Sequence, residues 1–269
     1  MTAPLFHLSP GALDDAGPGA TVVLSGAEGH HAATVMRLKP GEQVILSDTV
    51  GSRAEGIVRA AGVGELSVEI VQLTREPVLE PRLVLVQALA KDRRDLQGVE
   101  SATELGVDAI IPWQAERSVA RWKAGREAKK HAEWVATVTS AAKQTRRTSI
   151  PTVRALQTTT QYLETLRSTE RRIATIVLHE TDETSLAQAI AGHCASEPGP
   201  EELHLVIGPE GGISDREIEL LGAAGARIAR LGRTVLRSST AGPAALAATQ
   251  LLLGRWDWAA GTGHTEHTA

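Results

Sequence analysis

The sequence predicts an α/β protein built from a small β-rich N-terminal domain and a larger domain with a mainly parallel sheet. Residues 20–73 hold short segments rich in β-branched side chains, with turn signals between them. Residues 75–82 contain Pro77 and Pro81, and proline restricts both itself and the residue before it, so this stretch is the best linker in the chain. From about residue 80 to 256, apolar strand patterns alternate with helical ones, which is typical of a parallel sheet covered by helices.

The N-terminal domain, placed at residues 1–75, is expected to contain four strands and one short helix. The helix is predicted over residues 26–38, because Ala32, Val35 and Met36 recur at helical spacing. The expected strands are residues 21–25, 42–48, 54–60 and 65–73.

A linker is placed at residues 76–82, the second domain at 83–258 and a polar, flexible tail at 259–269. The longest helix is predicted over residues 126–144, where apolar residues recur every three or four positions, and a shorter one over 95–106 closes on a glycine. The expected strands are residues 82–90, 108–113, 171–180, 203–210 and 226–232, with a helix after each of the last three.

The composition excludes several classes of protein. With 269 residues, 42% hydrophobic and 22% charged, the chain is an ordinary globular protein rather than a disordered one. No apolar run approaches the roughly 20 residues of a membrane helix, and no secretory signal is expected at the start. The single cysteine, Cys194, excludes an internal disulfide framework and a cysteine-rich zinc site, so we expect a cytoplasmic protein. Five Trp, one Tyr and one Phe are too few for an RNA-binding face of stacked aromatic rings.

The net charge of −4 is unevenly distributed. Residues 1–80 and 155–269 each carry a net −5, whereas residues 81–154 carry 14 basic and 8 acidic side chains, a net +6. A basic segment between two acidic ones is compatible with a site for a polyanion. A solvated helical surface rich in Lys and Arg explains the charge equally well.

The strongest local signal is the glycine-rich turn Gly-Pro-Glu-Gly-Gly at residues 208–212. It follows an apolar strand segment and precedes a helix whose start is set by Ser214 and Glu217, which have the spacing of a capping box. Glycines let the backbone approach a ligand, and α/β proteins bind ligands at the carboxyl ends of their strands. Neither a P-loop nor a G-x-G-x-x-G pattern is present. A tight strand-to-helix turn without a ligand remains an alternative.

A second signal, residues 231–241, leads from a short strand into a helix rich in Ala and Leu. Ser239 and Thr240 are candidate N-caps, and hydroxyls with small side chains at a helix start suit close approach by a ligand or another chain. A plain N-cap before a well-packed helix is the alternative. This helix is apolar on more than one face, which favours a subunit interface, although burial within one chain would also explain it.

The remaining candidate groups of residues give only weak evidence of a functional site. His30 and His31 have no third metal ligand at useful spacing. Cys194 is expected in a loop without a base partner. Two basic clusters flank the long helix, and a solvated face is the simplest explanation for them: Arg117, Arg121 and Lys123, then Lys143, Arg146 and Arg147.

Taken together, these segments resemble the ribosomal RNA small-subunit methyltransferase E family, which belongs to the SPOUT (trefoil-knotted) methyltransferases. The turn at 208–212 with its capped helix, followed about two dozen residues later by Leu-Gly-Arg-Thr-Val-Leu-Arg-Ser-Ser-Thr-Ala at 231–241, is highly specific. The resemblance runs over nearly the whole chain. Its other pieces are residues 29–42, 87–113, 116–122, 141–153 and 178–180.

The resemblance implies a SPOUT-type trefoil-knotted α/β domain that binds S-adenosylmethionine, preceded by a PUA-like β-barrel domain that helps to hold RNA. It implies a homodimer with active sites at the subunit interface and no metal. The implied reaction is methylation of uridine N3 in 16S rRNA of the small ribosomal subunit, at position 1498 in the usual rRNA numbering.

The resemblance also carries site residues onto this sequence. The implied RNA-binding residues are Arg37, Arg117, Gln144, Arg146 and Arg147. The implied cofactor-binding residues are Leu178, His179, Glu180, Ile207, Gly208, Pro209, Glu210, Gly211, Gly212, Leu231, Gly232, Val235, Leu236, Arg237, Ser239, Thr240 and Ala241. The chain departs from the family at Ser239, where Glu is frequent, at Ser101, where Lys is frequent, and at Ile213, where Phe is frequent.

The chemistry of uridine indicates what the catalytic residues must do. N3 bears an imide proton, so its lone pair becomes available only when that proton leaves. A guanidinium stabilises the developing anion but does not act as the base, because Arg stays protonated. We therefore expect Arg147, with Arg117, to act electrostatically, and the proton to pass to water or to a carboxylate such as Glu180 or Glu210.

Two other functions remain open from the sequence. A SPOUT enzyme of different specificity, such as a ribose 2′-O-methyltransferase, would carry the same loops. A non-catalytic RNA-binding or assembly factor that kept the fold would also carry them, although retention of both cofactor loops argues against it.

Overall fold

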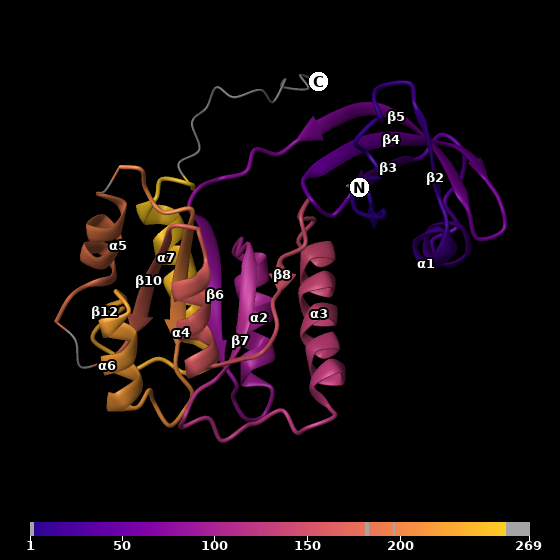
Figure 1. Ribbon diagram of the computed structural model, residues 1–269. Coiled ribbons are helices and arrows are strands. Elements are labelled where there is room, and N and C mark those ends of the chain that lie inside the picture. Colours follow the sequence, from indigo (N-terminus) through magenta and orange to yellow (C-terminus); the bar gives the residue numbers. More distant parts are fainter. Residues whose placement is uncertain (1–2, 181–182, 196, 257–269) are drawn as a thin grey trace. The chain divides into compact units, whose positions relative to one another are not determined.

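A computed structural model describes residues 3–180, 183–195 and 197–256 (Figure 1). The described chain forms two compact units. The first consists of the residues up to Arg82 together with Gly125–Val153, and the second consists of Leu83–Ala124 together with the residues from Arg154 onward.

The first unit is built on a five-stranded sheet with the order β1-β3-β4-β5-β2. Four predicted strands are present, and β1 is an additional one that pairs in parallel with β3. The apolar side chains of these strands form one buried core with Leu13 and Ala32. The strand bounds are β1 Leu5–His7, β2 Thr21–Leu24, β3 Gln43–Ser47, β4 Ser52–Ala61 and β5 Leu66–Arg75.

The helix expected over residues 26–38 is shorter than predicted. It consists of α1, Gly26–His30, continued by a π-helical turn, His31–Val35. Arg37 then adopts a left-handed backbone conformation with φ of 56°, which ends the helix. Pro40 also disfavours a helical conformation at the residue before it.

The long helix α3, Glu127–Gln144, forms as predicted and belongs to the first unit with the short strand β8, Thr152–Val153. The chain after α3 is attached to the sheet. Ser47 Oγ donates to Thr148 O at 2.6 Å, and Ile150 N donates to Thr49 O at 3.0 Å. The predicted second domain, 83–258, includes α3, whereas the structure assigns α3 to the first unit. The boundaries 1–75, 76–82 and 83–258 stay predictions, and the predicted tail 259–269 lies outside the described residues.

The second unit contains strands in the order β12-β10-β11-β6-β7, with β9 beside β7. The pairs β10–β11, β10–β12, β6–β7 and β7–β9 are parallel, which confirms the predicted α/β class. Every residue of β11 is buried, as expected for a strand covered on both faces. The bounds are β6 Arg82–Ala88, β7 Ala109–Gln114, β9 Gln157–Thr158, β10 Ile173–Leu178, β11 Glu202–Ile207 and β12 Arg227–Ala229.

Five helices of the second unit are described: α2 Arg94–Glu104, α4 Thr159–Ser168, α5 Leu186–Cys194, α6 Asp215–Ala223 and α7 Ser238–Leu252. Helices α5, α6 and α7 follow β10, β11 and β12, as predicted (Figure 1). The expected loop position of Cys194 is wrong, because this residue ends α5 and is half-buried. No helix in the described ranges is long and apolar enough to cross a membrane.

The predicted caps of α7 are also wrong. The N-cap is Arg237, and Ser239 and Thr240 lie inside the first turn. Ser238 is held by the core rather than by the helix start, because Gln87 Nε2 donates to its Oγ at 2.8 Å. Ser239 is buried where α2 and α7 meet, since a Cβ added at Gly98 would lie 3.4 Å from Ser239 Cα.

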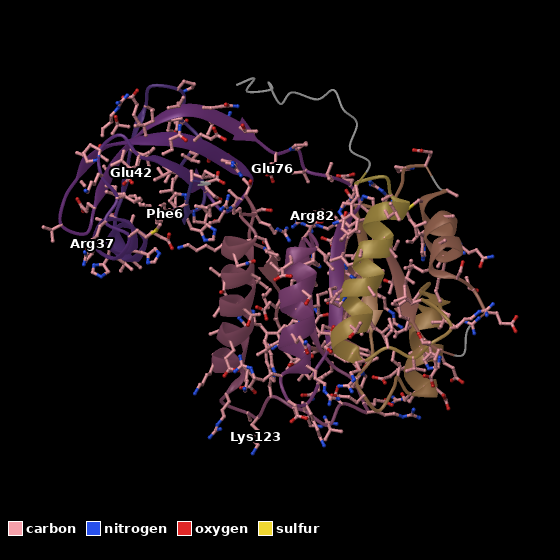
Figure 2. The ribbon with its side chains drawn as sticks, turned by 180° about the vertical axis from the view of Figure 1, so that it is seen from behind. Phe6, Arg37, Glu42, Glu76, Arg82 and Lys123 are labelled. Carbon is pink, nitrogen blue, oxygen red and sulfur yellow. The ribbon has the colours of Figure 1, made fainter. Side chains whose placement is uncertain are left out.

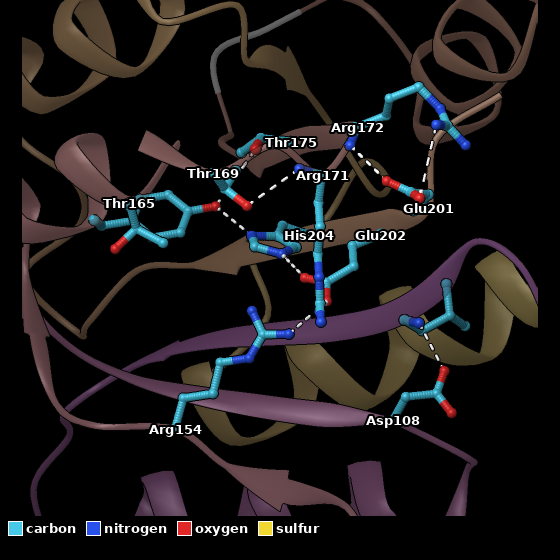
Figure 3. A network of polar contacts seen from close by, with 12 residues as sticks. Asp108, Arg154, Thr165, Thr169, Arg171, Arg172, Thr175, Glu201, Glu202 and His204 are labelled. Carbon is cyan, nitrogen blue, oxygen red and sulfur yellow. Dashed lines mark hydrogen bonds and ion pairs between the residues drawn. The ribbon is translucent and has the colours of Figure 1, made fainter. Parts of the chain in front are cut away.

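A buried polar network lies at the amino end of β11 (Figure 3). Glu202 Oε1 accepts hydrogen bonds from Arg154 and Arg171, each at 2.6 Å, and Oε2 lies 2.9 Å from His204 Nε2. His204 Nδ1 lies 2.8 Å from the hydroxyl of Tyr162. Burial alone would raise the pKa of the Glu202 carboxyl, but the hydrogen bonds from His204 and Arg154, with the charge of Arg154, hold that pKa well below its usual range. Burial lowers the pKa of His204.

Candidate active site

Three parallel strands end side by side in the second unit. In the sheet register, Leu178 at the end of β10 pairs with Ile207 at the end of β11 and with Ala229 at the end of β12. The segments that leave these three ends line one pocket of about 700 Å³. The pocket therefore lies where parallel α/β sheets place their ligands, at the carboxyl ends of the strands.

The glycine loop, Gly208–Gly212, forms one wall of this pocket. Gly212 has a positive φ of 73°, and its N–H donates to Pro209 O at 2.9 Å. A Cβ at Gly208 would lie 2.7 Å from the Ile213 side chain, and one at Gly211 would lie 3.1 Å from Arg117 O. The glycines are thus required by contacts within the chain as well as by the turn.

The predicted capping box at the start of α6 is confirmed. Ser214 Oγ accepts from Glu217 N at 3.1 Å, and Glu217 Oε2 accepts from Ser214 N at 3.1 Å. The box fixes the residue at which the glycine loop ends and the helix begins.

Most of the residues predicted to bind the cofactor line the pocket together, and their contacts with a cofactor stay predictions. Ser239 and Thr240 are not among the lining residues, and Ser239 is buried. The predicted residues on the wall are Leu178, His179, Glu180, Ile207, Gly208, Pro209, Glu210, Gly211, Gly212, Leu231, Gly232, Val235, Leu236, Arg237 and Ala241.

Seven further lining residues were not predicted. Six of them are close neighbours of predicted segments: Ile213, Asp215, Arg230, Arg233, Thr234 and Ser238. The seventh, Arg94, comes from the first turn of α2. Its side chain contacts Glu210, whose Oε1 lies 3.8 Å from Arg94 Nη1 and also accepts a hydrogen bond from Lys91 N at 3.2 Å. The only signal in the sequence was the basic run before that helix.

The charges on the wall are mixed. Three carboxylates, of Glu180, Glu210 and Asp215, face five guanidinium groups, of Arg94, Arg117, Arg230, Arg233 and Arg237. This excess of positive charge suits a ligand or substrate with carboxylate or phosphate groups.

Arg117 lines the pocket although it comes from the segment after β7 rather than from the loops after β10, β11 and β12. Its Nη1 lies 3.4 Å from Ile213 O, and its backbone packs on Gly211. The residue before it, Glu116, accepts a hydrogen bond from Ser214 Oγ, which lowers the pKa of the Glu116 carboxyl together with the charges of Arg216 and Arg117. An arginine predicted from the resemblance is therefore a neighbour of the glycine loop.

The other predicted RNA-binding residues belong to the first unit, and their roles stay predictions. Arg37 is exposed and points outward (Figure 2). Gln144 ends α3, and Arg146 adopts a left-handed conformation with φ of 59° directly after it. Arg147 N donates to Ala142 O at 2.9 Å, and the residue is half-buried.

Within the described ranges, no three or more His, Cys, Asp or Glu side chains gather in a way that could hold a metal ion. His30 and His31 lie at the junction of α1 and the π-helical turn.

Two family models match the chain. The model of an RNA methyltransferase domain matches residues 78–250, and the model of an RNA methyltransferase PUA domain matches residues 24–71.

Named relatives agree with these models. The chain is 42% identical over 258 residues to the ribosomal RNA small subunit methyltransferase E of Mycobacterium tuberculosis, which covers 96% of this chain and 95% of that protein. It is 29% identical over 239 residues to the protein of the same name from Bacillus subtilis, which covers 87% of this chain and 93% of the relative.

A solved structure is also similar. The ribosomal RNA small subunit methyltransferase E of Neisseria gonorrhoeae, bound to S-adenosyl methionine, superposes with a TM-score of 0.77 at 25% identity, covering 93% of this chain and 98% of that one. The pocket-lining loops lie within the matched methyltransferase domain. This chain belongs to the ribosomal RNA small subunit methyltransferase E family.

Proposed function

We propose that this protein transfers a methyl group from S-adenosylmethionine to N3 of a uridine in 16S rRNA of the small ribosomal subunit, at position 1498 in the usual rRNA numbering. The observation that carries the proposal is the pocket at the aligned ends of β10, β11 and β12. The names of the relatives and the cofactor bound to the Neisseria gonorrhoeae protein support it.

The residues of the pocket fit such a cofactor. A volume of about 700 Å³ lies within the usual range for small-molecule sites. Apolar side chains such as Leu178, Ile207 and Leu236 would hold the adenine. Carboxylates and guanidiniums on the wall would hold the amino and carboxylate groups of the methionine part.

When bound, the cofactor supplies an already activated methyl group, so the protein has to orient the two reactants and handle one proton. Arg117, together with Arg147, stabilises the negative charge that develops on the uracil ring when N3 loses its proton. Among the carboxylates of the wall, Glu180 is exposed, whereas Glu210 already accepts from Lys91 N. This difference favours Glu180, or water, as the acceptor of the proton.

The proposal includes the finer features of the family. The second domain carries a SPOUT-type trefoil knot, the first is a PUA-like β-barrel that binds RNA, and two copies form a homodimer that completes each active site without a metal. Exposed Leu251 and Leu252 at the end of α7 support an interface there. We expect the reaction to take place in the cytoplasm, where small subunits are assembled.

Methyl transfer to isolated subunits tests the proposal. The protein is incubated with 30S or 50S subunits and isotopically labelled S-adenosylmethionine, and the RNA is digested to nucleosides. The proposed function requires label in 3-methyluridine from 30S subunits alone. Label in a 2′-O-methyl nucleoside would show that the enzyme methylates a ribose hydroxyl rather than uridine N3. Cofactor binding without transfer to either subunit would favour a non-catalytic factor.

A further inference from the structure

A buried carboxylate in the second unit joins three segments that are far apart in the sequence. Glu217, in the first turn of α6, is 0% exposed. Its Oε2 accepts from Ser214 N at 3.1 Å, which is the capping box. Its Oε1 accepts from Glu116 N at 2.9 Å and from Thr159 Oγ1 at 2.6 Å. A capping box needs only the first of these contacts, so the other two call for a separate explanation.

A second connection runs between the same segments. Ser214 Oγ lies 2.6 Å from Glu116 Oε2 and 3.1 Å from Glu217 Oε2, so its single proton is donated mainly to the nearer Glu116. Arg216 Nη1 lies 2.7 Å from Glu116 Oε1. Hydrogen bonds therefore join the start of α6 and the segment after β7 in two ways. The Glu217 side chain binds the Glu116 backbone, and Ser214 Oγ binds the Glu116 side chain.

These contacts surround the backbone of Arg117. Its neighbour Glu116 is held through both the N–H and the side chain, and Arg117 itself packs on Gly211, where an added Cβ would lie 3.3 Å from Arg117 Cβ. The network is anchored in the core, because Trp113 Nε1 donates to Thr159 Oγ1 at 3.2 Å and Trp113 is 1% exposed.

We infer that Glu217, assisted by Glu116, is a positioning residue that holds Arg117 at a fixed place against the glycine loop. The inference rests on the proposed function, in which Arg117 stabilises charge on the uracil ring beside the cofactor. Glu217 acts through Arg117 and contacts neither reactant. A guanidinium on a loose loop would have to be ordered during each reaction, whereas one held in advance would not.

The chemistry of the contacts explains why a carboxylate stands at this position. Two backbone N–H groups, of Ser214 and Glu116, point at opposite oxygens of Glu217. In Glu217→Gln, one of those oxygens becomes an amide NH₂ group, which accepts no hydrogen bond. Hydroxyls can rotate to suit the amide, but a backbone N–H cannot, so one of the two segments must detach.

Two variants test the inference in the full-length protein. Glu217→Gln breaks the connection at its centre, and Glu116→Ala removes the half-exposed acceptor of Ser214 and Arg216. Glu116→Ala keeps the variant set informative if Glu217→Gln proves unstable. Glu219→Ala, on the exposed face of α6, is the matched control. Each variant is made in the wild-type protein and in Arg117→Ala.

In single-turnover methylation of 30S subunits, we expect Glu116→Ala and Glu217→Gln to lower the rate at least about tenfold, with affinity for S-adenosylmethionine changed less than threefold. In the Arg117→Ala background, each should change the rate less than twofold, because the group that they position is gone. The same fold-loss in both backgrounds would overturn the inference, as would wild-type rates in both folded variants.

Hydrogen exchange of the free protein separates this inference from the proposed function. Glu217→Gln should speed exchange of the amides at 116–118 while leaving those of α4 slow, and Glu219→Ala should change neither. If the wild-type protein methylates no uridine, the proposed function fails, and exchange still decides whether Glu217 holds the segment. If exchange at 116–118 stays at the wild-type rate, the positioning role is wrong, whatever the enzyme methylates.

Discussion

The arginines carry the proposed chemistry at the scale of single residues. Arg117 lies against the glycine loop of the second unit, and Arg147 follows α3 in the first unit, where its N–H donates to Ala142 O. A guanidinium cannot remove the N3 proton, but it lowers the energy of the anion that the loss of this proton leaves behind. The proposal therefore predicts that both residues affect the rate of methyl transfer rather than binding of the cofactor.

Arg147→Ala should reduce single-turnover methylation of 30S subunits by about 100-fold, the usual cost of removing one donor to a developing anion. Affinity for S-adenosylmethionine should stay unchanged. Arg126→Ala, an exposed arginine at the start of the same helix, is the control and should keep the wild-type rate. An unchanged rate in Arg147→Ala would remove this residue from the mechanism.

Glu202 links stability to pH. Its carboxyl pKa lies below the unfolded value of about 4.3, and burial holds the pKa of His204 below its own unfolded value of about 6.5. In each window between folded and unfolded pKa, the unfolded chain binds the extra proton, so stability falls as pH falls. The Glu202 contribution is complete at neutral pH and is lost progressively below about pH 4.3.

Glu202→Gln should therefore cost about 3 kcal/mol at pH 7, because it leaves Arg154 and Arg171 without their buried carboxylate. The difference from the wild type should shrink as pH falls below about 4, because the Glu202 carboxyl of the unfolded wild type then binds a proton, whereas the folded carboxyl, with its lowered pKa, stays ionised. Urea unfolding between pH 7 and pH 3 measures it. Glu201→Gln, whose ion pair with Arg172 is exposed, should cost about 0.5 kcal/mol. A difference that is constant with pH would contradict this explanation.

At the scale of elements, the glycine loop and the segment after β7 form one packed structure. Gly211 allows the backbone of Arg117 to approach, since an added Cβ would lie 3.1 Å from Arg117 O. That is tighter than most real Cβ contacts, so one of the two segments must shift by a few tenths of an ångström.

Gly211→Ala should lower the methylation rate at least about tenfold, because a shift of the reacting groups by a fraction of an ångström is costly. Gly222→Ala, in α6, is the matched control. Its new Cβ meets nothing within 4 Å, so it should keep the rate and add about 0.5–1 kcal/mol of stability, as Ala for Gly does within a helix. Wild-type activity in Gly211→Ala would show that the close approach is unnecessary.

The sequence predicted the elements whose signals are local. The capping box of α6 needs only Ser214 and Glu217, three residues apart, and it forms as expected. The second role of Glu217 could not be predicted, because its partner Glu116 lies 101 positions away. The same holds for β1, which is a strand only because it pairs with β3. The cap of α7 was misplaced because the helix already begins at Ser238, which puts Ser239 and Thr240 inside its first turn.

The sequence likewise predicted only part of the site. The loops at 208–212 and 231–241 were found because each follows a strand and carries an unusual motif, whereas residues 178–180 came from the resemblance. The three strands before these loops end in register. Arg94 was missed because only the fold brings α2 to Glu210. The roles of Arg37, Gln144, Arg146 and Arg147 came from the resemblance, since the local sequence carries no signal that separates an RNA contact from a solvated side chain.

At the scale of the whole molecule, the central basic segment should give RNA binding a steep dependence on salt. Affinity for 30S subunits should fall about tenfold or more between about 50 and 200 mM salt, because counterions leave the RNA when the protein binds. Filter binding across this range measures the slope. Affinity that stays constant across the range would remove the electrostatic part of RNA binding from the proposal.

The most direct measurement is nucleoside mass spectrometry of 30S subunits from cells that lack this protein, before and after incubation with the protein and S-adenosylmethionine. If the protein methylates uridine N3, 3-methyluridine is absent before the incubation and present after it. If 3-methyluridine is already present, or if a different methylated nucleoside appears, the proposed specificity is wrong.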